Sequence, residues 1–278
     1  MNTESDIAQD LMRDGYLSVD TDSVLRSALS ATYEAAYVFF RSPNEVKLQN
    51  TLAEDCGYRR RGIEYSDSPD RPDQMESFSA TARKIDLSGL GTDEGRQLYQ
   101  QMSNLIELLE AVAEKIVLAL GTALSSSHSD AAKLLGAFRE WSCLQLNYSR
   151  PAESPIEMIN DPHEDGNFVT LAFADGPGLE IQMSSGAYAP VVRKDASMIV
   201  MPGDIMWLMT GGRVKPLFHQ VRRHPNVGER IALLYFGDID PSRCNPWVLN
   251  EVNQGIDIGE RSKGNSFRFG LQGFTLEQ

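Results

Sequence analysis

The sequence lacks three features that would each assign the protein to a particular class. No stretch reaches the roughly 18 uninterrupted apolar residues that a membrane-spanning helix needs. The first residues, MNTESDIAQDLMRDGY, contain neither a basic segment nor a continuous apolar one, so we expect no secretory signal peptide. Cysteine is scarce, and Cys56, Cys143 and Cys244 are too far apart for a disulfide framework or a zinc knuckle. These absences predict a soluble, cytoplasmic protein with reduced thiols.

Positive charge is also in short supply. The 278 residues include 26 Lys and Arg against 39 Asp and Glu, which gives a formal net charge of -13 at pH 7. A surface of this sign repels the phosphates of nucleic acids and anionic membranes, so we expect neither as a partner. Hydrophobic residues make up 41% and charged residues 23%, which is typical of a folded globular protein. A small molecule is the expected partner, and the oligomeric state is left open.

The first half of the chain is predicted to be helical. Residues 22–40 have apolar side chains at helical spacing behind a capping residue, and a short helix is expected after Pro43. Residues 95–121 form the clearest helix, with Gly121 as its candidate end. Between these helices, residues 57–80 are rich in Gly, Pro, Asp and Arg and predict a long ordered loop that ends in a short strand.

The second half predicts a sheet protein. After the small-residue segment SSSHSD come short β-rich runs bounded by turns, namely CLQLNY, FVTLAF, LEIQM, APVV, SMIVM, DIMWLM, FHQVRR and RIALLYF. Strands at such close spacing, without helices between them, indicate an antiparallel sandwich or barrel. We therefore divide the chain into a helix-rich region 1–135, a β core 136–245 and a C-terminal segment 246–278.

The segment PHEDGNFVTLAF places a histidine and an aspartate two residues apart in front of an apolar run. In an extended segment, His163 and Asp165 project to one side and Glu164 projects to the other. One imidazole and one carboxylate are thus presented together, as a metal site requires. HEDGN does not have the H-E-x-x-H spacing of a zinc peptidase, since Asn167 stands in place of the second histidine.

A third ligand must come from elsewhere in the chain, and three further histidines are available. His128 lies in a Ser-rich segment and His224 precedes Pro225, so turn chemistry predicts that both are exposed. His219 differs because PLFHQV surrounds it with apolar residues. Two histidines and a carboxylate suit a non-haem Fe(II) with open positions, although the same ligands can bind catalytic zinc.

Arg230 opens the apolar run RIALLYF. An arginine that enters an apolar strand is costly unless it meets an anion, and its planar guanidinium binds a carboxylate through two parallel hydrogen bonds. It could therefore hold the distal carboxylate of 2-oxoglutarate. The alternative is that Arg230 caps the strand end or pairs with Asp204 or Glu229.

The order of LNYSRP, HEDGNFVTLAF, PGLEIQ, GDIMWLMTGGRVKPLFHQV and RIALLYF resembles the isopenicillin N synthase-like family of Fe(II)/2-oxoglutarate-dependent oxygenases. The resemblance implies a double-stranded β-helix core (a jelly-roll, cupin-like fold) that carries a helical N-terminal region. It implies that His163, Asp165 and His219 are the iron ligands. It also implies that Arg230 anchors the 2-oxoglutarate carboxylate.

Asn147 and Tyr148 match the start of the Asn-Tyr motif, whose side chains help to position the co-substrate in the resembled family. The chain departs from the family pattern at Ser149, which replaces a second tyrosine, and at Arg150, which precedes Pro151. Ala232 stands where the family has the serine of Arg-x-Ser, a loss of one hydrogen bond worth about 0.5–1.5 kcal/mol. This departure keeps open a 2-oxoglutarate-independent Fe(II) oxidase, in which Arg230 holds the carboxylate of the substrate.

The resemblance implies Fe(II) as cofactor, 2-oxoglutarate and O2 as co-substrates, and ascorbate as a supporting reductant. The expected reaction is hydroxylation, desaturation or cyclisation of a small metabolite, with release of succinate and CO2. Halogenating relatives have a small residue at the position of Asp165, so halogenation is not expected. The other alternative, from a different class, is a non-catalytic barrel that binds a ligand.

The substrate itself is not indicated by the sequence. Arg59, Arg60 and Arg61 lie in the loop region that helps to cover the active site in the resembled family, and one of them could bind a carboxylate or phosphate. The alternative is a solvated basic loop. Phe78 is a candidate for the cavity wall, with core packing as the alternative.

Overall fold

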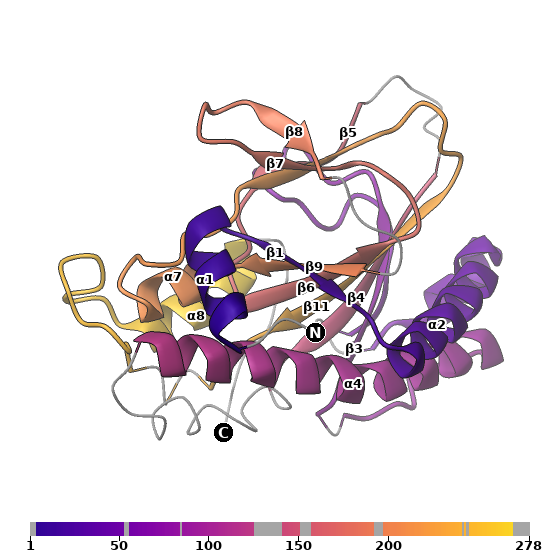
Figure 1. Ribbon diagram of the computed structural model, residues 1–278. Helices are drawn as coiled ribbons and strands as arrows, with labels where there is room; N and C mark the ends of the chain where they lie inside the picture. Colours follow the sequence, from indigo (N-terminus) through magenta and orange to yellow (C-terminus); the bar gives the residue numbers. More distant parts are fainter. Residues whose placement is uncertain are drawn as a thin grey trace.

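The protein consists of two antiparallel sheets with helices packed on the outer side of the larger one (Figure 1). The computed structural model describes residues 4–52, 56–83, 85–124, 141–150, 157–191, 197–240, 242 and 245–268. The larger sheet has the strand order β1-β9-β6-β11-β4-β3-β2, and the smaller sheet has the order β5-β10-β7-β8. The predicted mainly β fold with a helical N-terminal region is confirmed.

The strands of the larger sheet come from both halves of the chain. They are β1 (Leu17–Asp20), β2 (Gly57–Arg59), β3 (Glu76–Thr81), β4 (Cys143–Ser149), β6 (Val169–Ala174), β9 (Ser197–Pro202) and β11 (Arg230–Gly237). The smaller sheet contains β5 (Met158–His163), β7 (Leu179–Gln182), β8 (Tyr188–Pro190) and β10 (His219–Arg222). Since β1, β2 and β3 pair into the larger sheet, the region 1–135 is not a purely helical layer.

The larger sheet is supported by helices, of which α2 and α4 are the longest. The helices are α1 (Glu4–Asp14), α2 (Ser23–Arg41), α3 (Asn44–Lys47), the 3-10 helix η1 (Leu48–Asn50), α4 (Asp93–Leu124), α7 (Asp204–Met209) and α8 (Ile258–Arg268). The Asp22 carboxylate caps α2 by accepting a hydrogen bond of 2.8 Å from the backbone N–H of Leu25. None of the helices in the described ranges is both long and apolar enough to cross a membrane.

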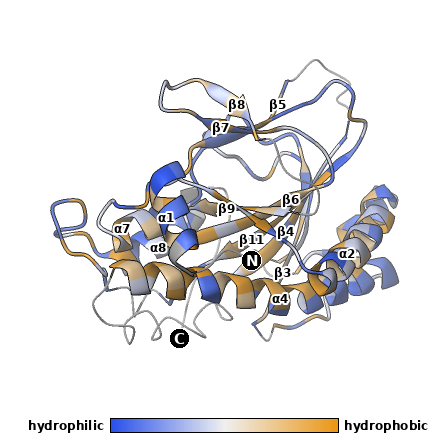
Figure 2. Cartoon of the chain, in the orientation of Figure 1, coloured by the Kyte–Doolittle hydropathy of each residue, from blue (hydrophilic) through white to orange (hydrophobic). Residues whose placement is uncertain are grey.

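Helix α4 provides the main apolar stripe that packs on the sheet. Leu98, Met102, Leu105 and Leu109 are fully buried in one core cluster with residues of β3, β4, β6 and β11. Figure 2 shows this hydrophobic layer along α4 and the central strands. The prediction that the helix ends at Gly121 is wrong, because the buried glycine lies within the last helical turns. A glycine inside a helix costs about 1 kcal/mol relative to alanine, and the packing of the helix outweighs this cost.

The segment DIMWLM forms helix α7, so its prediction as a strand is wrong. A short apolar run that is buried on all sides has no periodicity that separates strand from helix. The preceding Gly203 allows close backbone approach, because a Cβ there would lie 2.1 Å from the carbonyl oxygen of Asn167. Strand β5 was not predicted, since MINDPH contains a charged residue and a proline that weaken a strand pattern.

A buried ion pair joins the segment after α2 to β3. The Lys47 side chain is completely buried and its ammonium group pairs with the Glu76 carboxylate. Glu76 also accepts hydrogen bonds from the Tyr58 hydroxyl (2.8 Å) and the Arg150 guanidinium (2.6 Å). Burial alone would raise the pKa of Glu76, but the hydrogen bonds from Lys47 and Tyr58 outweigh it, and the pKa is lowered.

We expect the Glu76→Ala substitution to lower the free energy of unfolding by about 3–5 kcal/mol, because it leaves a buried ammonium without a counter-ion. Urea unfolding measures the loss, and the double variant Lys47→Met/Glu76→Ala should recover much of it. Since the folded-state pKa of Glu76 is lowered, its contribution is complete at neutral pH and disappears as the pH falls through that lowered pKa. A loss below about 1 kcal/mol would contradict the expectation.

Candidate metal centre and cavity

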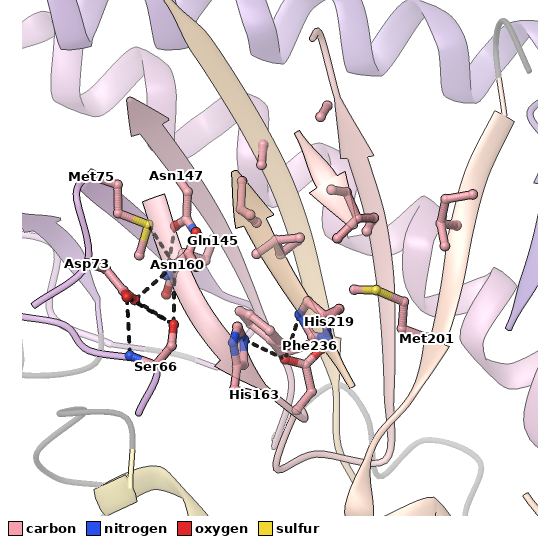
Figure 3. A pocket seen from close by; sticks show the side chains of 18 of the residues that line it. Ser66, Asp73, Met75, Gln145, Asn147, Asn160, His163, Met201, His219 and Phe236 are labelled. Carbon is pink, nitrogen blue, oxygen red and sulfur yellow. Dashed lines mark hydrogen bonds and ion pairs between the residues drawn. The ribbon is translucent and has the colours of Figure 1, made fainter. Parts of the chain in front are cut away.

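Two histidines face each other across neighbouring strands of the smaller sheet. His163 ends β5, His219 begins β10, and the two residues are direct partners in the antiparallel register. Their ring centroids are 4.3 Å apart, and Figure 3 shows the two side chains pointing toward one another. Asp165 follows β5, and its Oδ1 lies 3.7 Å from His163 Nε2 and 3.8 Å from His219 Nε2. The structure thus brings together the three residues that the sequence singled out.

The hydrogen bonds of the two rings leave their Nε2 atoms as ligands. His163 Nδ1 lies 2.7 Å from the carbonyl oxygen of Asp161, and His219 Nδ1 lies 3.0 Å from that of Leu217. Because a carbonyl only accepts, each Nδ1 carries the proton and each Nε2 presents a lone pair. Burial and the neighbouring His219 lower the pKa of His163 to about 4, so this imidazole is neutral at physiological pH.

The three ligand atoms fit a divalent metal ion. Two imidazole lone pairs and a carboxylate, all within 4.8 Å of one another, repel each other unless a cation lies between them. In the part of the chain that the structure describes, His163, Asp165 and His219 form the one group of His, Cys, Asp and Glu side chains with this arrangement. Two histidines and one carboxylate are the ligand set of non-haem Fe(II) sites that keep open positions.

The Asp165 carboxylate is oriented by a hydroxyl that the sequence interpretation missed. Thr170 on β6 donates a hydrogen bond of 2.6 Å from its Oγ1 to Asp165 Oδ2. The backbone N–H of Asp204 donates to the Asp165 carbonyl oxygen at 3.0 Å. The signal for Thr170 was available, because strand alternation places it on the same face as Ala172 and Ala174, which line the cavity.

We expect the Thr170→Val substitution to weaken Fe(II) binding about 10- to 100-fold, because it keeps the shape of the side chain and removes the hydrogen bond to the ligand carboxylate. Anaerobic calorimetry or competition with a chelator measures the affinity. Thr32→Val is a matched control, since Thr32 is also buried and bonds the Ala28 carbonyl oxygen in α2, away from the metal centre. An unchanged affinity in Thr170→Val would rule out this role.

The candidate metal ligands line a cavity of about 420 Å³ between the two sheets. Strands β4, β6, β9 and β11 of the larger sheet form one wall, and β5, β7 and β10 of the smaller sheet form the other. The loop residues Glu64, Tyr65, Ser66 and Asp73 contribute at one side. The residues from the sequence prediction that line the cavity are Asn147, His163, Asp165, His219 and Arg230.

Arg230 is buried at the start of β11 and lines the cavity with Ala232 and Leu234. Its Nε donates a hydrogen bond of 3.3 Å to the carbonyl oxygen of Gly176. The two carboxylates considered as alternative partners of Arg230 form ion pairs with other residues, Asp204 with Arg261 and Glu229 with Arg41. The guanidinium therefore belongs to the wall of the same cavity as the candidate metal ligands.

Asn147 and Tyr148 lie on opposite faces of β4. Asn147 lines the cavity and is the register partner of Ala232 on β11. Tyr148 faces the helices, where its ring stacks on Phe40 with centroids 4.9 Å apart and its hydroxyl donates to Glu229 at 2.7 Å. The prediction that Tyr148 positions the co-substrate is wrong, because successive residues of a strand point to opposite faces.

The three arginines predicted as substrate residues have separate environments. Arg59 is buried and donates hydrogen bonds of 2.7 Å to Glu64 Oε1 and 2.7 Å to Gln145 Oε1. Both of these acceptors line the cavity, whereas Arg59 does not. Arg60 and Arg61 are exposed and do not line it either, as the alternative of a solvated basic loop predicts.

Phe78, a candidate for the cavity wall, packs in the core instead, as the alternative predicts. Its side chain is fully buried in the main core, in edge-to-face contact with Phe39 at a centroid distance of 4.9 Å. In the register of β3 it lies beside Leu146, which faces away from the cavity. His224 is exposed, as predicted. His128, Pro151 and Cys244 lie outside the described residues.

Comparison with known proteins agrees with this geometry. Residues 140–238 match the family model described as the 2OG-Fe(II) oxygenase superfamily. The chain is similar to gibberellin 2-beta-dioxygenase 2 of Arabidopsis thaliana, with 27% identity over 285 residues that cover 92% of this chain and 81% of the relative.

Solved structures have the same fold at lower identity. A full-length Neurospora crassa protein in complex with alpha-KG and thymine superposes with a TM-score of 0.75 at 17% identity, covering 94% of this chain and 91% of that one. The protein JOX2, in complex with 2OG, Fe and JA, superposes with a TM-score of 0.74 at 19% identity, covering 88% of this chain and 73% of that one.

Proposed function

Because this chain belongs to the 2OG-Fe(II) oxygenase superfamily, we propose that it oxidises a small-molecule metabolite with release of succinate and CO2. The family match and the dioxygenase relative support an Fe(II)- and 2-oxoglutarate-dependent dioxygenase. The observation that carries the proposal is the pair of Nε2 lone pairs and the Asp165 carboxylate in one cavity with Arg230. Relatives of similar fold were solved with thymine and with JA, which supports a small organic substrate.

In this proposal His163, Asp165 and His219 hold the iron. Fe(II) bound there supplies the redox chemistry that couples reduction of O2 to oxidation of 2-oxoglutarate and of the substrate. Arg230 binds the distal carboxylate of 2-oxoglutarate through its planar guanidinium. The buried position of Arg230 strengthens this pairing, because little water is present to screen it.

The neighbours of Arg230 adapt the cavity to the co-substrate. Ala232 provides no hydroxyl, but the Asn147 side chain lies directly across from it on β4. Asn147 Oδ1 accepts a hydrogen bond of 2.8 Å from Gln145 Nε2, which orients the Asn147 Nδ2 group as a donor. The apolar side chains of Ile199, Met201 and Leu234 line the wall and keep water away from the bound 2-oxo acid.

A mass-spectrometric screen for substrate-dependent conversion of 2-oxoglutarate to succinate tests the proposal. The purified protein is incubated with Fe(II), ascorbate and a panel of metabolites in air, and succinate is expected in a one-to-one ratio with oxidised product. Oxidised product without succinate would favour the 2-oxoglutarate-independent oxidase. Absence of 2-oxoglutarate consumption across the panel, together with hydrolysis supported by Zn(II), would exclude the oxygenase function.

A further inference from the structure

A cluster of polar side chains lies on the loop side of the cavity. Figure 3 shows Ser66, Asp73, Met75 and Asn160 gathered on one side of the histidine pair. The Asp73 carboxylate accepts hydrogen bonds from the Ser66 hydroxyl (2.9 and 3.0 Å), from the Ser66 backbone N–H (3.2 Å) and from Asn160 Nδ2 (2.8 Å). These neutral donors fix the orientation of a carboxylate that lines the cavity.

Asp73 differs from Glu64 and Glu76 because it has no cationic partner in the described part of the chain. Glu64 is paired with Arg59, and Glu76 is paired with Lys47. The contacts of Asp73 are with Ser66 and Asn160, and the residue is 6% exposed. Burial raises the pKa of Asp73 to about 7, and the charge of Glu64 adds to the rise. A cation that enters the cavity would offset this cost.

The surroundings of Asp73 favour a cation over an anion. Among the described residues that line the cavity, Arg230 is the one Lys or Arg side chain, and it lies on β11, whereas the Asp73 cluster is built by the loop and β5. Glu64 on the same loop side is already paired with Arg59, so an anionic group there would meet the carboxylate of Asp73 with no nearby cation among the described lining residues to offset it. Asn160 Oδ1 accepts no hydrogen bond within the described ranges and offers a second acceptor.

An apolar surface adjoins the carboxylate. Met75 and Val221 line the cavity and pack with Ile159 in a small hydrophobic cluster. The Met75 sulfur lies 3.6 Å from Asn160 Nδ2, which places the cluster next to the polar group. A ligand that matches both parts has a charged nitrogen on a short apolar chain or ring.

We propose that this side of the cavity binds the ammonium group of a small amine substrate, with Asp73 as its counter-ion and Asn160 Oδ1 as a second acceptor. Met75 and Val221 contact the hydrocarbon part of the same molecule. The inference rests on the proposed function, since it takes the cavity beside the metal centre to be the substrate site.

Calorimetry with three probes of equal chain length tests the proposal. Hexylamine, 1-hexanol and hexanoate are titrated, without O2, into the protein loaded with Fe(II) and 2-oxoglutarate. Hexylamine should bind about 10- to 100-fold more tightly than 1-hexanol, as a charge-assisted hydrogen bond predicts, and hexanoate should bind more weakly than either. Asp73→Asn keeps the shape of the side chain and should remove the preference for the amine. Asp86→Asn, which removes the same charge from an exposed loop, should keep it.

Several outcomes would overturn the proposal. One is that hexylamine binds no more tightly than 1-hexanol or fails to bind, and another is that hexanoate is the tightest probe. The third such outcome is a preference for the amine that persists in Asp73→Asn. The ranking of the three probes on the unmodified protein decides the matter even if the variant does not fold. Titration of 2-oxoglutarate alone separates the two proposals, because Fe(II)-dependent 2-oxoglutarate binding without an amine preference removes this inference and leaves the proposed function.

Discussion

The His219→Ala substitution should abolish tight Fe(II) binding and, with it, formation of succinate. In the proposed site His219 provides one of three ligand atoms, and alanine would leave Asp165 and His163 to bind the ion alone. The Fe(II) affinity should fall by more than about 100-fold, which is the largest loss expected when the changed residue only orients a metal ligand. Anaerobic calorimetry with Fe(II) and a succinate assay at saturating 2-oxoglutarate measure the two effects.

His224→Ala is the matched control for this experiment. His224 lies a few residues further along the chain, is exposed, and contacts the backbone N–H of Asn226 at 3.4 Å. Its removal should leave iron binding and succinate formation unchanged. If His219→Ala retained the Fe(II) affinity of the unmodified protein, the metal centre would have to be assigned elsewhere, and the non-catalytic barrel would become the better description.

The Arg230→Met substitution should raise the KM for 2-oxoglutarate by about 100-fold or more. Methionine fills similar space in the cavity wall but would remove the two parallel hydrogen bonds that we propose between Arg230 and the carboxylate, each worth about 1.5–3 kcal/mol when charged groups are involved. Each 1.4 kcal/mol corresponds to a factor of ten in affinity. Fe(II) affinity should change little, because Arg230 is not among the three candidate ligands.

Arg222→Met controls for the loss of a positive charge near the site. Arg222 ends β10, is 45% exposed, and pairs with Glu157 and Glu180 on the outside of the smaller sheet. The KM for 2-oxoglutarate in Arg222→Met should stay within about 3-fold of the unmodified value, as is usual for exposed ion pairs. A normal KM for 2-oxoglutarate in Arg230→Met, with a raised KM for the metabolite instead, would support the oxidase in which Arg230 holds the substrate.

The sequence was sufficient to predict that His163, Asp165 and His219 lie together, because these residues follow local rules. His163 and Asp165 occupy alternate positions at a strand end, and His219 lies in an apolar run, so both features are visible in short segments. The same rule of alternation predicts that Tyr148 points away from Asn147, and it was the family motif rather than the strand geometry that led to the wrong prediction. Thr170 was likewise visible as a polar residue on the cavity face of β6.

The loop side of the cavity could not be predicted in this way. Asp73 meets Asn160 across 87 positions of sequence, and Arg59 meets Gln145 across 86. Arg59, Arg60 and Arg61 are three identical residues in a row, so the sequence does not distinguish them. Tertiary packing determines that Arg59 is buried against Glu64 while the other two are exposed. Side-chain pairs of this kind depend on how the loop packs against β3, β4 and β5.

The pairing of β1 with β9 has a consequence for aggregation. Leu17 to Asp20 cover the outer edge of β9, whose six residues are all buried and mostly apolar. A shortened form that began after residue 20 would leave the backbone N–H and carbonyl groups of that edge without partners, and an exposed apolar edge is a template for pairing with another molecule. The short strand β1 therefore covers the apolar edge of β9 and replaces it with an edge of four residues, which offers a poorer template for pairing.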